Sequence, residues 1–326
     1  MSKRIIIIHG RNTKPARRHY EDLQKQALIQ GIHRVDPAKA ARIADGAIAI
    51  DFVYYGDINN QILGKRKKIR DTMTERDPDY GNAPCIPHGA AHQALGDLAN
   101  IRRFTKASYN KILRNNKDSR WLDDAARALS TLSAITTATW LNTQAISIAT
   151  ADMGAYLMTR KVGSEVRGRL QQPLKSALKR GDDICLISHS MGCMVSYDVL
   201  WKFSRMSEYR DVQEGNPKVN LWLTLGCPLG EAGVKQNLYD GGERDHDMYP
   251  INIVRDWVNI AARDDFVAHD ATMKDDYRSM LKWDFLETIK DKKVYNCYAE
   301  GGVSYPHRFY GYLAHSVVGE TVANWM

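Results

Sequence analysis

Short apolar runs recur along the chain and predict buried β-strands. The most apolar run is residues 5–8, four successive isoleucines that end on His9 and Gly10. Neither this run nor "ICLIS" at 184–188 alternates apolar with polar residues, so both faces of each strand should be buried, as in a parallel sheet covered by helices. The predicted strands are residues 5–8, 48–54, 184–188, 219–225, 251–259 and 294–298.

Helical patterns separate these strands. Residues 162–179 have the pattern of a crossover helix that leads into the strand at 184, and residues 316–325 have that of a closing helix. Strands that alternate with helices favour right-handed crossovers and a doubly wound, mostly parallel sheet. We therefore predict a single α/β domain over residues 1–326.

The interval between the second and third predicted strands is too long for one crossover. A loop-like stretch rich in Pro and Gly at 76–89 is followed there by helical patterns. We expect residues 59–160 to form a helical cap or lid inserted into the domain. Within it, residues 128–151 carry no charged side chain, but their many Thr and Ser residues favour a buried or lid helix over a membrane span.

The strongest chemical motif is "SHSMG" at 188–192. An apolar strand precedes it and a helical pattern follows, which is the strand–turn–helix arrangement of a nucleophile elbow. Such a turn holds Ser190 in a strained conformation and requires small residues two positions away, here Ser188 and Gly192. Ser190 is therefore the candidate nucleophile rather than a plain turn serine. The N–H of Met191, at the helix N-terminus, is a candidate oxyanion donor.

With this motif the chain resembles the α/β-hydrolases of the serine esterase and lipase type. It is similar to an uncharacterised bacterial branch whose N-terminus reads HGRN-x-KP, matched here from His9 to Pro15. The resemblance covers nearly the whole chain and implies about six strands, without the two antiparallel strands that often precede the first central one. It also implies that the N–H of Arg11 completes the oxyanion hole and that His9 fixes this loop by hydrogen bonds.

A serine nucleophile needs a histidine base and an acid that orients it, which hydrolases place in the order Ser, acid, His. The resemblance puts the histidine in a loop after the last strand and shortly before the closing helix, which favours His315, with His307 as the main alternative. It also puts the acid in a D-x-V pattern after a W-x-N strand, which favours Asp265 over Asp264.

Five further residues are candidates for lining the substrate site, because they lie at predicted strand ends or beside the nucleophile. They are His9, Gly10, His189, Cys227 and Pro228. Each also has a plain structural interpretation as a turn or core residue.

Charge and cysteine content limit the classes of function. The formal net charge is +8, with basic stretches at 64–71 and 101–117. Neither stretch carries a nucleic-acid-binding signature, so a solvated surface is favoured, with an anionic membrane or an acidic partner as the alternative. The five cysteines include no C-x-x-C pair, and the isoleucine run is too short for a secretory signal. We expect reduced thiols, no bound metal and a cytoplasmic protein.

These observations together predict a serine hydrolase that cleaves carboxylic esters through an acyl-enzyme and needs no cofactor. The uncharged stretch at 128–151 favours a small-molecule ester with an apolar acyl group, although thioesters and amides suit the same residues. The alternative is a non-catalytic protein of the same fold whose lid docks a partner or an anionic membrane.

Overall fold

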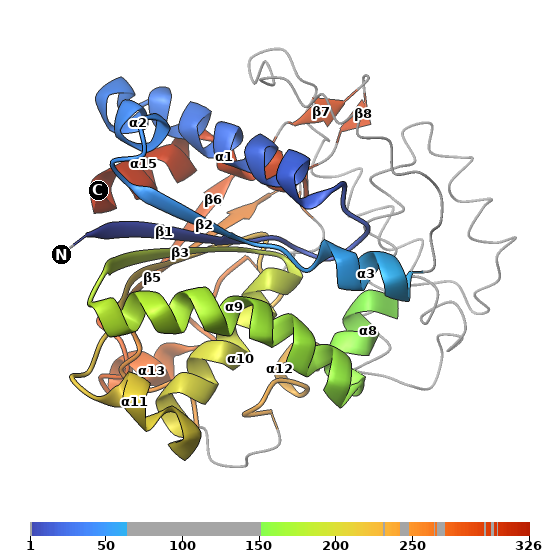
Figure 1. Ribbon diagram of the computed structural model, residues 1–326, viewed down its shortest axis with the longest axis vertical. Helices are drawn as coiled ribbons and strands as arrows, with labels where there is room; N and C mark the ends of the chain where they lie inside the picture. Colours follow the sequence, from blue (N-terminus) through green and yellow to red (C-terminus); the bar gives the residue numbers. More distant parts are fainter. Residues whose placement is uncertain are drawn as a thin grey trace, which may run out of the picture.

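A six-stranded parallel sheet forms the centre of the protein (Figure 1). The structure is a computed structural model that describes residues 2–63, 151–230, 232–241, 248–263, 265, 271–296, 298–300, 303–304 and 306–326. The strands are β1 (Lys3–Ile8), β2 (Ala49–Val53), β3 (Asp183–His189), β4 (Val219–Leu225), β5 (Val254–Ala262) and β6 (Thr288–Val294). They pair in the order β2-β1-β3-β4-β5-β6, and every pair is parallel, which confirms the predicted parallel α/β sheet.

Helices cover both faces of this sheet (Figure 1). One face carries α1 (Arg17–His33), α2 (Pro37–Ala44), α14 (Phe309–Leu313) and α15 (Ser316–Trp325). The other carries α9 (Arg160–Arg180), α10 (Met191–Arg205), α11 (Arg210–Gln213), α12 (Ala232–Lys235) and α13 (Arg278–Lys282). Near the carboxyl ends of the strands lie α3 (Gly56–Ile62) and α8 (Ala151–Met158). The remaining short elements are η1 (Ser207–Tyr209), β7 (Ala299–Glu300) and β8 (Val303–Ser304).

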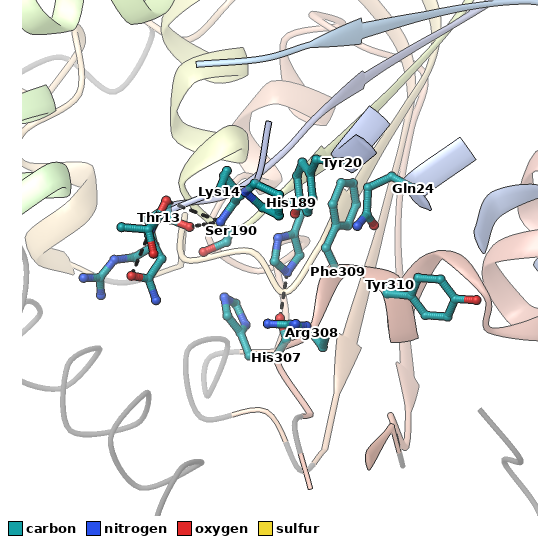
Figure 2. A pocket seen from close by; sticks show the side chains of 13 residues that line it. Thr13, Lys14, Tyr20, Gln24, His189, Ser190, His307, Arg308, Phe309 and Tyr310 are labelled. Atoms are coloured by element: carbon teal, nitrogen blue, oxygen red, sulfur yellow. Dashed lines mark hydrogen bonds between the residues drawn. The ribbon is translucent and has the colours of Figure 1, made fainter. Parts of the chain in front are cut away.

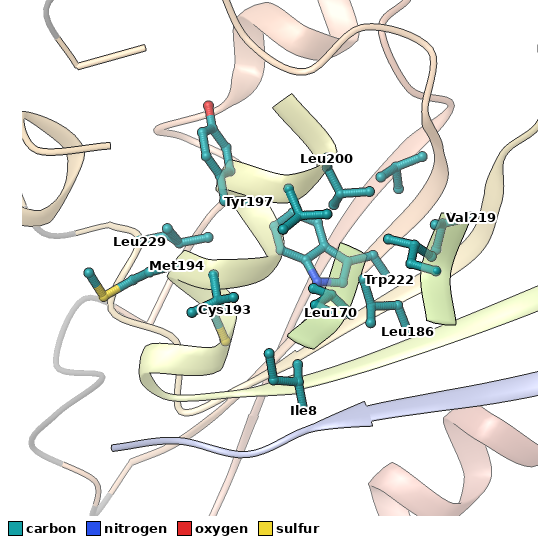
Figure 3. Packing of buried hydrophobic residues seen from close by; sticks show 14 of the residues in the cluster. Ile8, Leu170, Leu186, Cys193, Met194, Tyr197, Leu200, Val219, Trp222 and Leu229 are labelled. Atoms are coloured by element: carbon teal, nitrogen blue, oxygen red, sulfur yellow. The ribbon is translucent and has the colours of Figure 1, made fainter. Parts of the chain in front are cut away.

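The isoleucine run forms a central strand, because β1 lies between β2 and β3. All four isoleucines are fully buried, and successive side chains point to opposite faces. Ile5 and Ile7 join one hydrophobic cluster, whereas Ile6 and Ile8 join the other. Figure 3 shows Ile8 in the second cluster, which surrounds Trp222. Burial on both faces therefore explains why this run does not alternate.

A row of polar side chains crosses the sheet near the carboxyl ends of its strands. The row consists of Ser188, Thr224, Asn259 and Asp291, which are register partners on β3, β4, β5 and β6. Thr224 donates to Asn259 at 3.0 Å, and Asn259 donates to Asp291 at 3.0 Å. The indole N–H groups of Trp222 and Trp257 donate to Ser188 and Thr224. These hydrogen bonds make the burial of Ser188, Thr224 and Asn259 tolerable.

The helices α1 and α15 touch through their backbones. A Cβ atom added to Gly319 would lie 1.9 Å from the Gly31 carbonyl oxygen, so only glycine fits there. The end of α15 is also tied to β1, since Lys3 Nζ donates to the Trp325 carbonyl at 2.8 Å. The closing helix predicted at 316–325 is confirmed and completes one layer of the fold.

Two predicted strands differ from the observed ones. The last strand is Thr288–Val294 rather than 294–298, and β5 is Val254–Ala262 rather than 251–259. Among the described strands, β6 pairs only with β5 at the edge of the sheet, and its Lys290 and Lys293 side chains remain exposed. An edge strand of this kind lacks the continuous apolar run by which the other strands were predicted.

Most of the predicted cap, residues 59–160, falls on residues 64–150, which lie outside the described residues. Also outside the described residues are the basic stretches at 64–71 and 101–117, residues 128–150, Asp264 and Cys297. Among the helices that the structure describes, none combines the length and apolar character needed to cross a bilayer.

A buried carboxylate links α8, α9 and α10. Asp198 on α10 accepts a hydrogen bond from the Tyr156 hydroxyl of α8 at 2.5 Å, and Arg167 of α9 lies 3.5 Å from the same oxygen. The Tyr239 backbone N–H donates to its other oxygen at 3.1 Å. Burial nevertheless raises the pKa of Asp198 to about 6.

The Asp198 carboxyl should give stability a measurable pH dependence. Because its pKa is higher in the folded chain than in the unfolded chain, its contribution to stability is complete at low pH and is lost as pH rises through about 6. We expect the free energy of unfolding of the wild type, relative to Asp198→Asn, to fall by about 2 kcal/mol between pH 4 and pH 7. Chemical denaturation of both proteins across this range measures the difference, and parallel curves would contradict the assignment.

Candidate active site

Ser190 lies in the turn between β3 and α10. Its backbone has φ 52° and ψ −126°, a combination that residues other than glycine rarely adopt. The Ser190 N–H donates to the Leu225 carbonyl at 3.0 Å, and the Ser190 carbonyl accepts from the Cys193 N–H at 2.9 Å. The strained turn predicted from "SHSMG" is therefore present, and Ser190 lines a cavity. Met191 follows as the first residue of α10, where its N–H has no partner within the helix.

Two glycines bring this turn against the end of β1. A Cβ atom on Gly192 would lie 2.6 Å from the His9 carbonyl oxygen, and one on Gly10 would lie 2.7 Å from the Ser190 Cβ. Any larger residue at either position would force the two segments apart. The loop that starts at Gly10 is thereby held beside Ser190, and Arg11 lines the same cavity.

Asp265 and His307 form a hydrogen-bonded pair in the same region. His307 Nδ1 lies 2.7 Å from Asp265 Oδ2, and the Tyr312 hydroxyl donates to that oxygen, also at 2.7 Å. The Asp265 side chain is completely buried, whereas that of His307 is 17% exposed and lines the cavity with Ser190 (Figure 2). With Nδ1 on the carboxylate, Nε2 is the nitrogen left for proton transfer. That nitrogen is buried and has no hydrogen-bond partner within the described part of the chain.

The prediction that His315 partners Asp265 is wrong, because the structure puts His307 there. His315 is instead the N-cap of α15, where its Nδ1 accepts a hydrogen bond from the Val317 N–H at 3.1 Å. The short helix α14 explains the difference. The chain turns back into helical structure at Phe309, so the loop before the closing helices ends at His307 and Arg308 rather than at His315.

His9 is a fixed, neutral part of the β1 loop. Its Nδ1–H donates to the Gly10 carbonyl at 2.7 Å, and its Nε2 accepts from the Tyr55 N–H at 3.1 Å. The Tyr55 hydroxyl donates to the His9 carbonyl at 2.5 Å. Complete burial and the nearby Lys14 ammonium hold the pKa of His9 well below its usual value. These hydrogen bonds agree with the expected role of His9 in fixing the loop.

The residues after Arg11 are tied to α3. Lys14 and Asn60 exchange two hydrogen bonds of 2.9 Å, from the Lys14 N–H to the side-chain amide oxygen and from that amide back to the Lys14 carbonyl. Asn59 donates to the Asn12 carbonyl at 3.3 Å, and the Lys14 ammonium donates to the Arg11 carbonyl. The "RN-x-K" part of the motif therefore forms a loop whose backbone is held from several sides.

His189 connects the turn of Ser190 to the segment that carries His307. Its Nε2–H donates to the His307 carbonyl at 3.0 Å, and its ring stacks on Phe309 at 4.6 Å between centroids. Complete burial and the adjacent His307 hold the pKa of His189 well below its usual value. A neutral His189 thus orients the backbone at His307.

The cavity beside Ser190 is lined about equally by polar and apolar surface in the part of the chain that the structure describes. It is lined by Arg11, Asn12, Thr13, Lys14, Pro15, Tyr20, Gln24, His189, Ser190, His307, Arg308, Phe309 and Tyr310 (Figure 2). Of the five residues predicted to contact substrate, only His189 belongs to this lining. Cys227 and Pro228 are buried and do not line the cavity. His9 and Gly10 do not line it either, but they precede Arg11 and pack beneath its loop. Within the described ranges, His, Cys, Asp and Glu side chains form no cluster of three that could ligate a metal.

Several residues of the site carry no local sequence signal. Tyr312 and Gly226 contact Asp265, and Asp152 contacts the β1 loop, yet none belongs to a recognisable motif. The one weak signal is the aromatic segment "HRFYGYL" at 307–313, which contains Phe309 and Tyr312.

Comparison with known protein families, with curated protein sequences and with solved structures gave no match.

The contact of Gly226 with the Asp265–His307 pair can be tested by adding one methyl group. A Cβ atom on Gly226 would lie 2.9 Å from Asp265 Oδ2 and 3.1 Å from His307 Nδ1, and its φ of +53° disfavours any other residue. Gly226→Ala should lower the free energy of unfolding by about 2–4 kcal/mol.

The matched control is Gly46→Ala, because Gly46 has a φ of +83° but open space where its Cβ would lie. This variant should lower the free energy of unfolding by only about 1 kcal/mol, the cost of a left-handed backbone conformation at a residue other than glycine. Denaturant unfolding of both variants measures the two losses, and equal losses would show that Gly226 makes no special contact.

Proposed function

We propose that this protein is a serine hydrolase that cleaves carboxylic esters through an acyl-enzyme intermediate. Ser190 is the nucleophile, His307 the general base and Asp265 the acid that orients it. The observation that carries the proposal is the Asp265–His307 hydrogen bond of 2.7 Å on a cavity shared with the strained Ser190. The three residues follow β3, β5 and β6, in the order nucleophile, acid, histidine that α/β-hydrolases use. We accordingly propose the α/β-hydrolase fold for this sheet, with residues 59–160 as its cap.

Each step of the reaction has a group to perform it. His307 Nε2 removes the Ser190 hydroxyl proton as Oγ attacks the ester carbonyl, and Asp265 stabilises the resulting imidazolium. The N–H groups of Met191 and Arg11 bind the oxyanion of the tetrahedral intermediate. His307 then gives its proton to the departing alcohol. Water, activated by the same nitrogen, hydrolyses the acyl-enzyme and restores Ser190.

Two parts of the chain bear on the choice of acyl group. The expectation of an apolar acyl group rests on residues 128–151, nearly all of which lie outside the described residues. The described lining contributes Arg11, Lys14 and Arg308, which suit a polar or anionic portion of the ester. Hydrolysis of p-nitrophenyl esters of increasing acyl length, set beside a hemisuccinate ester, separates these preferences.

The nucleophile can be tested with a fluorophosphonate probe. Because this reagent phosphonylates serines activated by a base, the wild type should label at one site, and Ser190→Ala should not label. Peptide mass spectrometry of the labelled protein should locate the adduct at Ser190.

A folded wild type that neither labels nor hydrolyses any ester would overturn the enzymatic proposal. The non-catalytic binding protein would then be the better hypothesis. Ser196→Ala is a suitable control, since Ser196 is buried on the same helix and bonds Ser188 rather than lining the cavity.

Substitution of the two histidines by alanine should give opposite results. His307→Ala should lower kcat by about 10⁴-fold, because it removes the base. His315→Ala should keep kcat within a few-fold of the wild type while lowering the free energy of unfolding by about 1 kcal/mol, because it removes a helix cap. Steady-state kinetics and denaturant unfolding of both variants measure this contrast. A large loss of kcat in His315→Ala with an active His307→Ala would reverse the assignment.

A further inference from the structure

A buried carboxylate outside the proposed triad binds the loop that carries Arg11. Asp152 lies in the first turn of α8, and its side chain is completely shielded from solvent. The Asn12 backbone N–H donates to Asp152 Oδ2 at 2.5 Å, and the Arg11 Nη2 lies 3.3 Å from Oδ1. Asp152 therefore contacts Arg11 and Asn12, the two residues that come directly after Gly10, where the chain packs against Ser190.

The charges of this contact favour an ionised Asp152. Burial alone would raise the pKa of the carboxyl, but Arg11 and the Asn12 N–H outweigh it and bring the pKa below the usual value. A buried charge of this kind is costly unless its partners stay in place. The arrangement thus restricts the Arg11–Asn12 backbone to the position in which both partners reach the carboxylate.

The same face of α8 is anchored to the other half of the proposed oxyanion hole. Tyr156, one helical turn after Asp152, donates to Asp198 on α10, and α10 begins at Met191. Two side chains at i and i+4 on one helix therefore touch the two elements that supply the Arg11 and Met191 amides. A shift of α8 would alter the distance between those amides.

We propose that Asp152 is a positioning residue, which holds the Arg11 amide where it can bind the oxyanion. The inference rests on the proposed function of Ser190 and adds to it a group that touches neither the substrate nor the triad. A merely structural Asp152 would contribute to folding without affecting transition-state binding.

Asp152→Asn is the direct test, because it keeps the size of the side chain and removes the charge that faces Arg11. We expect kcat/KM for a short ester to fall by about 10- to 100-fold, somewhat less than the loss of a complete oxyanion donor, with KM nearly unchanged. Affinity for an alkyl boronic acid, which forms a tetrahedral oxyanion on serine, should fall by the same factor. The pH at which kcat/KM is half-maximal should not move, because His307 and Asp265 are intact.

Asp57→Asn serves as the matched control. Asp57 is an exposed acid on the neighbouring α3, where it pairs with Arg169 at 2.6 Å. Its loss should leave kcat/KM and boronate affinity at wild-type values. If Asp152→Asn does not fold, Arg11→Met removes the same ion pair from the other side, keeps the backbone N–H, and should show the same loss in both measurements.

The outcomes separate this inference from the proposed function. If the wild type binds boronate and hydrolyses esters but the folded Asp152→Asn matches it in both, Asp152 has no positioning role and the triad stands. The positioning role is also overturned if kcat/KM falls while boronate affinity stays at the wild-type value. If the wild type itself has no activity and binds no boronate, the proposed function fails first, and this inference fails with it.

Discussion

Backbone contact between the end of β1 and the turn after β3 is the constraint on which the rest of the site depends. Gly10 and Gly192 have no space for a Cβ atom, so no side chain separates the two segments. The contact lies where the connections divide, because the helices after β1 cover one face of the sheet and those on either side of β3 cover the other. Open α/β sheets bind ligands at such a division. The strained Ser190 and the loop of Arg11 meet there because the topology brings both strand ends to one edge.

Much of this arrangement could be predicted from the sequence, because its signals are local. Four consecutive isoleucines indicate a strand buried on both faces, and "SHSMG" after an apolar strand indicates a strained turn before a helix. Both features depend on residues within a few positions of one another. The edge strand β6 was misplaced for the opposite reason, since "TIKDKKV" is stabilised by pairing with β5 and not by an apolar pattern of its own.

The remaining parts of the site depend on contacts between distant residues, and these leave no pattern in the chain. His307 and His315 both follow the last strand, and only the short helix α14 determines which of them reaches Asp265. Asp152 lies 140 positions from Asn12, to which it is hydrogen-bonded. A local motif marks a serine in a turn, whereas the buried acid that holds the Arg11–Asn12 loop is determined only by the folded chain.

The central place of β1 has a consequence for how the chain is made. Its partner strand β3 follows 180 positions later, as the contact between Lys3 and Asp183 shows. The packing of α1 is likewise incomplete until α15 has been made. During synthesis the four isoleucines are therefore produced long before most of the residues that bury them. Contacts of such long sequence separation slow folding, and an unpaired apolar strand is prone to aggregate in the meantime. The feature that stabilises the sheet thus leaves the nascent chain with an apolar strand that is incompletely covered until the residues of β3 have been made.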